Sequence, residues 1–313
     1  MKTIYLKEPF SEPKTCVVTI GMFDGVHRGH CFVIDCLREE AESRQLPSCV
    51  VTFDCHPRQV VCPDWHPQLL STLDEKLMLL SETGIDLCVV LPFTKELAAL
   101  SARNFMQQVL KEQIGAEVLL TGYDNHFGHR GQGQQEGFDD YRRYGQELGM
   151  EVKALPAEGV VNSSLIRQLL TEGRIEEAND CLGYPYTVTG TVVGGEHIGS
   201  RLGFPTANLQ PADACKLIPA NGAYAVKVRL GNSFVQKHAM TNIGRRPTFD
   251  GHQTTLETHI LQYEGKLYGQ QMAVSFCHRL RDEQRFDTPE ALAEQLRHDA
   301  ETTEKLFNQD SEE

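Results

Sequence analysis

The string His-x-Gly-His at His27 and His30 follows an apolar run over residues 16–20. Apolar side chains recur at helical spacing after it, so the sequence predicts a strand, a tight loop and then a helix. A loop that enters a helix N-terminus binds anions, because its backbone N–H groups lack intrahelical partners. Gly25 and Gly29 let this loop approach a nucleotide closely. The two imidazoles can donate to phosphate oxygens as charge builds during nucleotidyl transfer.

Two further polar segments stand where apolar runs of the first half end. The first covers residues 52–57 and ends in His-Pro. The second is a glycine-broken loop over residues 122–133, which contains Gly122, Asp124, Asn125 and Phe127. Its aromatic and polar side chains suit a planar ring and a phosphate, and the alternative interpretation is a solvated surface loop.

A third polar segment, residues 161–167, begins another predicted helix. Ser163 and Ser164 supply hydroxyls at its start, and Arg167 follows one turn later. Hydroxyls at a helix N-terminus often act only as caps, but with an arginine on the same face they can bind a triphosphate. No serine or cysteine nucleophile with a base partner stands out in the sequence, so we expect direct transfer without a covalent intermediate.

The second half carries its chemistry in a string that runs from Gly199 to Leu209. Thr206 and Asn208 lie two apart and would point the same way in an extended segment. A hydroxyl and an amide oxygen are hard ligands that suit Mg²⁺. The glycines between 190 and 203 suit a flap over phosphates, but the Gly-Lys-Ser/Thr ending of a Walker loop is absent.

Glu257 is the candidate base of the second half. It stands in a segment that alternates as a strand does, and it faces away from Leu256 and Ile260. From that position it can accept a proton from an attacking hydroxyl. The alternative is a solvent-facing strand glutamate without a catalytic role.

The elements that position these residues fall into two groups, from which we predict domains over 1–183 and 184–313. Five apolar runs alternate with amphipathic helical patterns in the first domain, which predicts a parallel sheet with ligands beyond its strand ends. The runs are 16–20, 48–53, 87–91, 117–121 and 151–155, and the helices begin near Thr72 and Ser101 and cover about 137–148, 163–171 and 175–182.

The second domain has a different pattern. Its runs are rich in β-branched and aromatic residues with Gly, Pro and Asn between them, which predicts an antiparallel barrel or sandwich. These runs are 187–193, 223–230, 234–242, 254–262 and 271–277. A final helix is expected from Pro289 to Phe307.

Composition narrows the classes of function. The formal net charge is −13 and neither half has a basic patch, so we expect no nucleic-acid partner. No apolar run is long enough to span a membrane and the N-terminus lacks a signal peptide, so we expect a cytoplasmic protein without a membrane partner. The ten cysteines are scattered without a Cys-x-x-Cys pair, which disfavours a disulfide framework or zinc site.

Taken in order, these strings resemble the bifunctional prokaryotic riboflavin kinase/FMN adenylyltransferases over nearly the whole chain. The shared motifs include Phe-Asp-Gly-Val-His-x-Gly-His, Phe-Asp-x-His-Pro, Gly-Tyr-Asp-x-x-Phe-Gly, Gly-Phe-Pro-Thr-Ala-Asn, Asn-Ile-Gly-x-x-Pro-Thr-Phe, Leu-Tyr-Gly and Arg-x-Glu-x-x-Phe. The resemblance implies a Rossmann-like nucleotidyltransferase domain and a six-stranded β-barrel flavokinase domain. It also implies two reactions: riboflavin and ATP give FMN and ADP, and FMN and ATP give FAD and pyrophosphate.

The resemblance implies residue roles as well. His27, His30, Ser164 and Arg167 would bind and activate ATP for adenylylation, Thr206 and Asn208 would hold Mg²⁺-ATP, and Glu257 would deprotonate the ribityl hydroxyl. Further nucleotide or flavin contacts are expected at Gly21, Phe23, Asp24, Gly25, Ser163, Gly122, Asp124, Asn125, Phe127, Gly199, Arg201, Gly203, Arg281 and Phe286. The sequence departs from the family pattern at Met22, Cys55, Asn125, Asn162 and Gln262, mostly in the adenylyltransferase half.

Two alternatives remain open from the sequence. One is a nucleotidyltransferase that acts on another substrate, since His-x-Gly-His alone is widely shared. The other is a flavin carrier or sensor without turnover, in which the barrel serves as a ligand cup. In each case the partners are small molecules, and we expect a monomer or a weak homo-oligomer.

Overall fold

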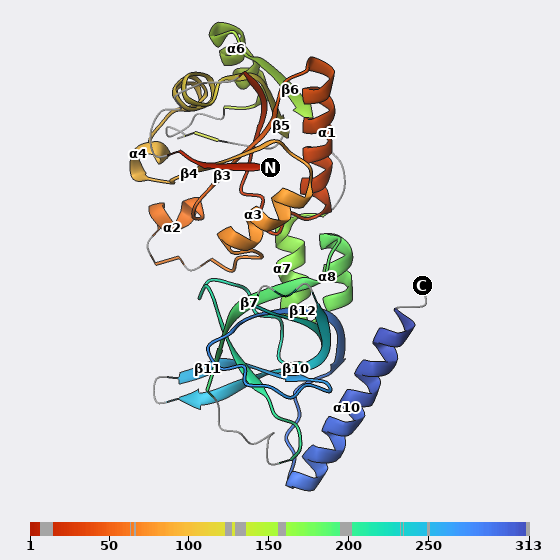
Figure 1. Cartoon of the computed structure of the whole chain (residues 1–313). Helices are drawn as coiled ribbons and strands as arrows, with labels where there is room; N and C mark the ends of the chain where they lie inside the picture. Colours follow the sequence, from red (N-terminus) through yellow and green to blue (C-terminus); the bar gives the residue numbers. More distant parts are fainter. Residues whose placement is uncertain are drawn as a thin grey trace. The chain divides into compact units, whose positions relative to one another are not determined.

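The computed structural model describes two compact units, Met1–Ser163 and Ser164–Glu313 (Figure 1). The described residues are 1–6, 15–62, 64–65, 67–122, 127–128, 136–155, 161–194, 202–231, 233, 235–248 and 251–310, with the backbone alone for 245–248 and 251–253. None of the helices within these residues combines the length and the apolar character that a membrane span requires.

The first unit is built on a six-stranded parallel sheet in the order β1-β4-β3-β2-β5-β6. Its strands are β1 (Lys2–Tyr5), β2 (Cys16–Ile20), β3 (Ser48–Phe53), β4 (Leu87–Leu91), β5 (Ala116–Gly122) and β6 (Glu151–Leu155). The chain moves outward from β2 through β3 to β4 and then returns to the other side of β2. The strand order therefore reverses between β2 and β5, where open sheets of this kind bind ligands.

Helices cover both faces of this sheet (Figure 1). Buried residues of β2 alternate, so that Val17 packs toward one set of helices and Val18 toward the other. The first set is α1 (Arg28–Arg44) and α3 (Leu73–Glu82). The second set is α5 (Ala102–Phe105), the π-helix η1 (Met106–Ile114) and α6 (Phe138–Leu148). Two short helices, α2 (Pro57–Val61) and α4 (Lys95–Ala98), follow the ends of β3 and β4.

The second unit is a closed antiparallel barrel in the order β10-β11-β8-β7-β12-β9. Its strands are β7 (Tyr186–Val193), β8 (Ala207–Pro211), β9 (Gly222–Leu230), β10 (Gln236–Thr248), β11 (Gly251–Ile260) and β12 (Gln271–Arg281). Burial alternates strictly along β7, so one face of the strand fills the barrel and the other lies outside. The core is therefore the barrel interior itself.

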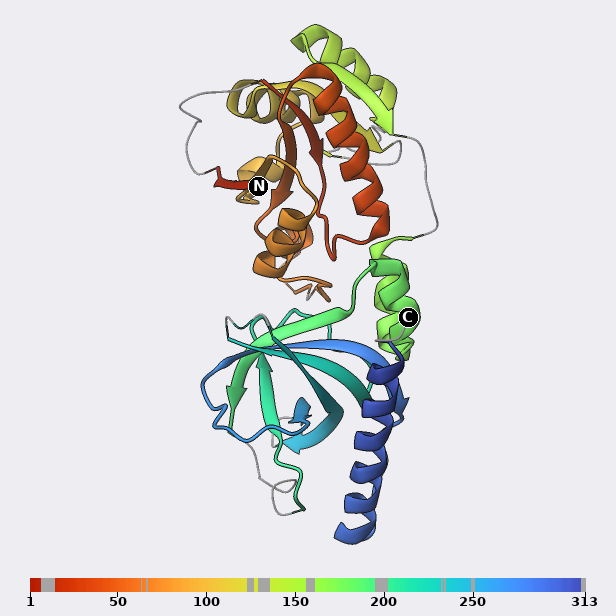
Figure 2. The ribbon, with the colours of Figure 1, turned by 45° about the vertical axis from the view of Figure 1, so that its right-hand side comes forward.

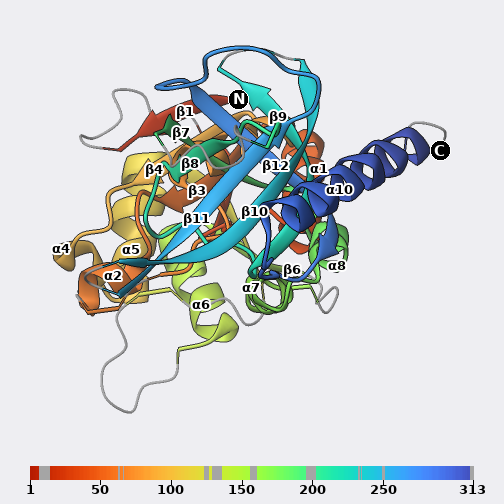
Figure 3. The ribbon, with the colours of Figure 1, turned by 90° about the horizontal axis from the view of Figure 1, so that it is seen from below.

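Three helices pack on the outside of this barrel. α10 (Pro289–Gln309) runs along it (Figure 2) and crosses β9, β10 and β12 (Figure 3). α7 (Ser163–Glu172) and α8 (Ile175–Leu182) precede the first barrel strand. The Asn179 side chain on α8 donates to the Phe276 carbonyl at 2.8 Å and accepts from the Tyr186 N–H at 2.7 Å, so α8 is fastened to β12 and β7.

The predicted fold classes are confirmed: a parallel α/β unit and a six-stranded antiparallel barrel with a terminal helix. The capping box predicted at Thr72 and Glu75 is present, and Ser101 caps α5. The sequence patterns missed β1 and β8. β1 is a four-residue edge strand that is only half-buried, and β8 follows a proline within the predicted metal-binding string.

Candidate functional site

The loop after β2 lies at the reversal point of the first sheet and adopts an unusual backbone. Phe23 has φ 48°, Val26 has φ 35° and Gly25 has φ 82°. A left-handed conformation is costly for an aromatic or β-branched residue, and such strain concentrates at functional sites. Gly21 joins this loop to the sheet, because its N–H donates to the Val51 carbonyl at 3.1 Å.

The carboxylate of Asp24 clamps this loop from within. It is buried, and it accepts hydrogen bonds from the backbone N–H groups of Leu70 and Ser71 at 2.9–3.1 Å. The Ser71 hydroxyl donates to the same carboxylate and accepts from the Gly25 N–H. The structure therefore places the predicted contact residue Asp24 in a role that shapes the loop.

The two histidines of the loop stack on each other, with ring centroids 3.7 Å apart. Nδ1 of His27 accepts from the His30 N–H at 3.4 Å and so caps α1, which leaves the proton on Nε2 in the neutral ring. Burial, then His27, then Lys76 lower the pKa of His30 well below its ordinary value, so its ring is neutral. Nδ1 of His30 is buried without a hydrogen-bond partner, which is unusual for a native polar group. Such an atom suits a ligand.

The segment that follows β6 returns to this loop. A Cβ on Gly29 would lie 3.1 Å from the Val161 carbonyl, so glycine allows the two segments to approach closely without a tight contact. The Ser163 hydroxyl donates to the Asp24 carbonyl at 3.2 Å. Ser164 and Arg167 lie on α7 directly after it, within the second compact unit.

The loop after β5 is described only at its two ends. Asp124 and Asn125 lie outside the described residues, whereas Gly122 ends β5. Phe127 stacks on Tyr141 of α6, with centroids 4.3 Å apart, and the Tyr141 hydroxyl bonds to its backbone. In this structure Phe127 anchors the end of the loop.

In the second unit, strand register gathers three polar side chains around Glu257. Asn208 of β8 lies directly opposite Glu257 of β11, and Asn242 of β10 lies opposite it on the other side. Their neighbours Ala207, Thr258 and the other alternate residues are buried in the barrel, so the three polar side chains share its outer face. Thr206 lies two residues before Asn208 and shares its face in an extended segment. Gly199 and Arg201 lie outside the described residues, and Gly203 has φ 85°.

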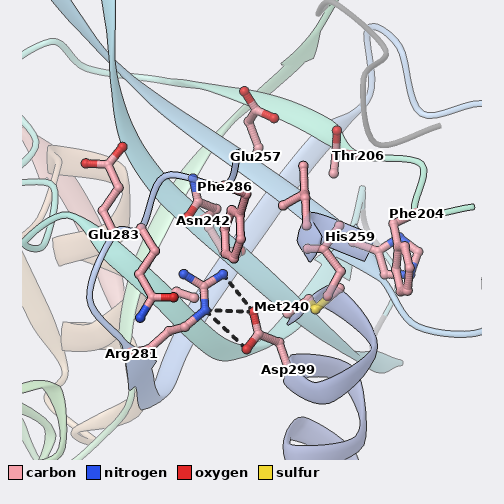
Figure 4. Close-up of a pocket in the computed structure, with 15 residues that line it drawn as sticks. Phe204, Thr206, Met240, Asn242, Glu257, His259, Arg281, Glu283, Phe286 and Asp299 are labelled. Atoms are coloured by element: carbon pink, nitrogen blue, oxygen red, sulfur yellow. Dashed lines mark hydrogen bonds and ion pairs between the residues drawn. The ribbon is translucent and has the colours of Figure 1, made fainter. Parts of the chain in front are cut away.

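A cavity of about 270 Å³ opens on this outer face (Figure 4). Glu257 and Thr206 line its upper side in the view, and the Arg281–Asp299 ion pair lines its lower side. The remaining walls are mostly apolar or aromatic and come from β9, β10, β11, the segment after β12 and α10. They include Phe204, Ala223, Met240, Asn242, His259, Glu283, Phe286, Leu292 and Leu296.

The Arg281–Asp299 pair fixes α10 to the end of β12. The guanidinium makes a forked contact with the carboxylate at 2.8–3.2 Å, and the two side chains are only 14% and 5% exposed. Gln295 also donates to Asp299 at 2.8 Å, and the guanidinium of Arg281 lies over the ring of Phe286. The predicted contact residues Arg281 and Phe286 therefore both line the cavity, and Arg281 also holds one of its walls.

A second cavity, of about 320 Å³, lies on the other side of Thr206. Thr206 lines both cavities, and the second is otherwise lined by Val192, Pro205, Ala207, Thr258, Ile260, Tyr263 and residues 265–268, with Tyr268 exposed at its edge. The Thr206 side chain therefore lies between the largely apolar cavity, which the Glu257 carboxylate lines, and the second cavity. This arrangement suits group transfer between two bound molecules.

Three residues of these sites escaped the sequence patterns. Lys76 lies on the apolar face of α3, between Leu73 and Leu80. A lysine at an apolar position of an amphipathic helix is the one feature of the sequence that could have indicated a buried charge there. Asn242 was visible only as part of a family motif. Asp299 had no local signal, because its partner is on another element.

The oxygen donors of the barrel site fit a magnesium ion. Asn208 and Glu257 face each other across the β8–β11 pair, and Thr206 adds a hydroxyl on the same face. No group of three or more His, Cys, Asp or Glu residues with metal-site spacing occurs in the part of the chain that the structure describes.

Comparisons with known proteins identify the family of each half of the chain. The chain matches the FAD synthetase family over residues 10–166 and the riboflavin kinase family over 182–307. It is 36% identical to the bifunctional riboflavin kinase/FMN adenylyltransferase of Escherichia coli, with 93% of each chain covered, and 35% identical to that of Listeria monocytogenes, with 98% of each covered. A crystal structure from Streptococcus pneumoniae, described as a macrolide-efflux protein, superposes with a TM-score of 0.86 at 30% identity and covers 96% of this chain and 98% of its own. The chain belongs to the bifunctional riboflavin kinase/FMN adenylyltransferase family.

Proposed function

We infer that this protein makes FAD from riboflavin in two ATP-dependent steps. The second domain phosphorylates riboflavin to FMN, and the first domain adenylylates FMN to FAD with release of pyrophosphate. The family match in each half supports this assignment. The observation that carries it is that Glu257, which faces Asn208 across the β8–β11 pair, lines a largely apolar cavity together with Thr206.

In the kinase site, Glu257 acts as the general base. We place the flavin ring in the 270 Å³ cavity and ATP in the 320 Å³ cavity beyond Thr206. The ribityl hydroxyl oxygen then forms a bond to the γ-phosphorus, its proton passes to the Glu257 carboxylate, and ADP leaves. Because the carboxylate and the hydroxyl would be held in one cavity, positioning supplies much of the rate enhancement.

Thr206 and Asn208 are the residues that would hold Mg²⁺ at this site. The ion would offset the charge of the ATP phosphates, which matters in a chain of net charge −13. Asn242 lies on the opposite side of Glu257 and would orient its carboxylate.

In the adenylyltransferase site, the loop after β2 binds the phosphates of ATP. The N–H on Nε2 of His27 and the ring of the neutral His30 would donate to phosphate oxygens at the start of α1. The Ser164 hydroxyl would donate to the leaving pyrophosphate and the Arg167 guanidinium would neutralise its charge, while the Ser163 hydroxyl holds the loop through the Asp24 carbonyl. A phosphate oxygen of FMN attacks the α-phosphorus, and the bond to pyrophosphate breaks.

One reaction tests the assignment: purified protein with riboflavin, ATP and Mg²⁺, and the flavins separated by chromatography. FMN followed by FAD is expected. Glu257→Gln should abolish FMN formation and leave the adenylylation of supplied FMN intact, while the exposed control Glu264→Gln changes neither. Near-normal kinase turnover in Glu257→Gln would remove Glu257 as the base.

The adenylyltransferase site has its own variant. His30→Ala should spare FMN formation and lower FAD formation by about 100-fold, the loss typical of one transition-state donor. FMN as the sole product of the wild-type protein would mean that the departures at Asn125 and Asn162 have abolished adenylylation. Bound riboflavin without any product would support the carrier hypothesis instead.

Three assignments remain proposals beyond the activity. We propose a boundary between the catalytic domains at Gly183, supported by the riboflavin kinase match that begins at 182, whereas the compact units divide earlier, at Ser163. We also propose a cytoplasmic location and a monomer or weak homo-oligomer. Cell fractionation and sedimentation would test these last two.

A further inference from the structure

A lysine is buried at the carboxyl ends of β2 and β3, next to the loop that carries the two histidines. Lys76 projects from α3 and is only 5% exposed. Its ammonium group donates to the Phe53 carbonyl and the Thr52 hydroxyl at 3.0 Å and to the Met22 carbonyl at 3.3 Å. All three of its protons are used by these acceptors, so it ties the histidine loop to the end of the neighbouring strand.

The surroundings of Lys76 include two structural carboxylates. Asp24, after β2, and Asp54, after β3, both interact with it electrostatically. Both carboxylates accept backbone N–H groups, Asp24 from residues 70 and 71 and Asp54 from Phe93, so both serve to shape the loops. Two negative charges near a polyphosphate site oppose ATP binding.

The other titratable groups that face Lys76 supply no positive charge. Burial raises the pKa of Cys55 and of Cys88 to about 11, so both remain neutral thiols. His56 lines the same small cavity as Lys76 and caps α2 with its ring, and His30 is neutral because burial lowers its pKa. Among the described residues around this cavity, Lys76 is therefore the cation that offsets the two aspartates.

We propose that Lys76 is a positioning residue of the adenylyltransferase site: its ammonium group holds the Met22 carbonyl, and thereby the histidine loop, against β3 and offsets the charge of Asp24 and Asp54. Nothing in its geometry requires contact with substrate. The inference rests on the proposed location of that site at the loop after β2.

The protonation of Lys76 gives the test its readout. Burial lowers the pKa of Lys76 to about 8, against the opposing effect of Asp24, Cys88, Asp54 and Cys55. The charged form is therefore present at pH 7 and is lost as the pH rises to 9.5. In the neutral form the amine keeps two donors and no longer offsets the carboxylates.

The experiment compares kcat/KM for ATP in FAD formation between pH 7 and 9.5 for the wild type and Lys76→Gln, which is neutral throughout. The variant should be at least about 10-fold slower at pH 7 and within about 3-fold of the wild type at pH 9.5, because the two then carry the same charge. Lys111→Gln, which removes a surface lysine bonded to the Gly149 carbonyl, is the matched control and should follow the wild type at each pH.

Each outcome decides between the possibilities. The proposal would be overturned if the ratio of kcat/KM between the wild type and Lys76→Gln stayed near 1 or did not change with pH. A lysine with a purely structural role predicts a constant ratio. If the variant does not fold, the wild type alone decides, because a kcat/KM without an alkaline decline between pH 7 and 9.5 contradicts the proposal. His30→Ala tests the location of the site separately from the role of Lys76. Unchanged FAD formation in that variant would refute the location of the adenylyltransferase site at the loop after β2, whatever the result for Lys76.

Discussion

Removal of the Asp299 carboxylate should strongly destabilise the second unit. Asp299→Ala leaves the Arg281 guanidinium, only 14% exposed, without its forked partner. Breaking a buried pair by removal of one member costs about 3–5 kcal/mol of unfolding free energy, because the remaining charge is uncompensated. For a unit of this size that corresponds to a fall in Tm of about 10 °C.

Two variants calibrate this value. Gln295→Ala removes a single hydrogen bond to Asp299 and should cost only about 1 kcal/mol. The double variant Arg281→Met with Asp299→Leu removes both charges, so it should recover most of the loss and unfold within about 2 kcal/mol of the wild type.

The assay separates the two units within one chain. Trp65, the only tryptophan of the sequence, lies in the first unit, so its fluorescence reports that unit during urea unfolding. Far-ultraviolet circular dichroism reports the whole chain, including α10 of the second unit. We expect Asp299→Ala to move the dichroism transition and leave the Trp65 transition in place. A loss no larger than that of Gln295→Ala would refute the view that this pair anchors α10.

Three further predictions follow from contacts already described. Acidification below about pH 6.5 should destabilise the first unit, because burial lowers the pKa of His30 and the unfolded chain then binds a proton that the folded chain does not. The unfolding free energy measured by Trp65 fluorescence should therefore depend less on pH in His30→Gln than in the wild type. An unchanged pH dependence would contradict the prediction. Gly128→Ala should lower the unfolding free energy of the same unit by more than about 2 kcal/mol, because Gly128 has φ 86° and an added Cβ would lie 2.4 Å from the Ala102 nitrogen. Gly137→Ala places its Cβ in open space, so it should change the unfolding free energy only slightly in the same experiment. A fragment that begins at 184 should melt about 5–10 °C below one that begins at 164, because it lacks α7, α8 and the Asn179 bonds, and equal melting would show that these helices do not stabilise the barrel.

Much of the fold could be predicted because periodicity and strand spacing are local. The buried runs at 16–20 and 48–53 and the capping box at Thr72 are encoded within short segments, and the structure confirms them. The π-helix Met106–Ile114 could not be distinguished from a continuation of α5, because the same residues face inward in either helix. The half-buried edge strand β1 lacks a strong apolar signal for a similar local reason.

The sites were predicted less completely, since they depend on register and on distant partners. The type and spacing of Thr206 and Asn208 indicated oxygen ligands, but only the β8–β11 register shows that Asn208 faces Glu257. Asp24 was predicted as a ligand contact, whereas its carboxylate accepts from residues 70 and 71, which are 46 and 47 positions away. No sequence pattern indicates that pairing.

The cavity that we assign to the flavin lies outside the barrel wall, between β10, β11 and α10, and the barrel interior is filled by its own side chains. Phe286, Leu292 and Leu296 therefore shape the cavity without filling the barrel, whereas Arg281 and Asp299 both line it and hold α10 in place. Leu292 and Leu296 on α10 face the cavity without belonging to the barrel core, so libraries restricted to these positions can explore flavin analogues of different ring size.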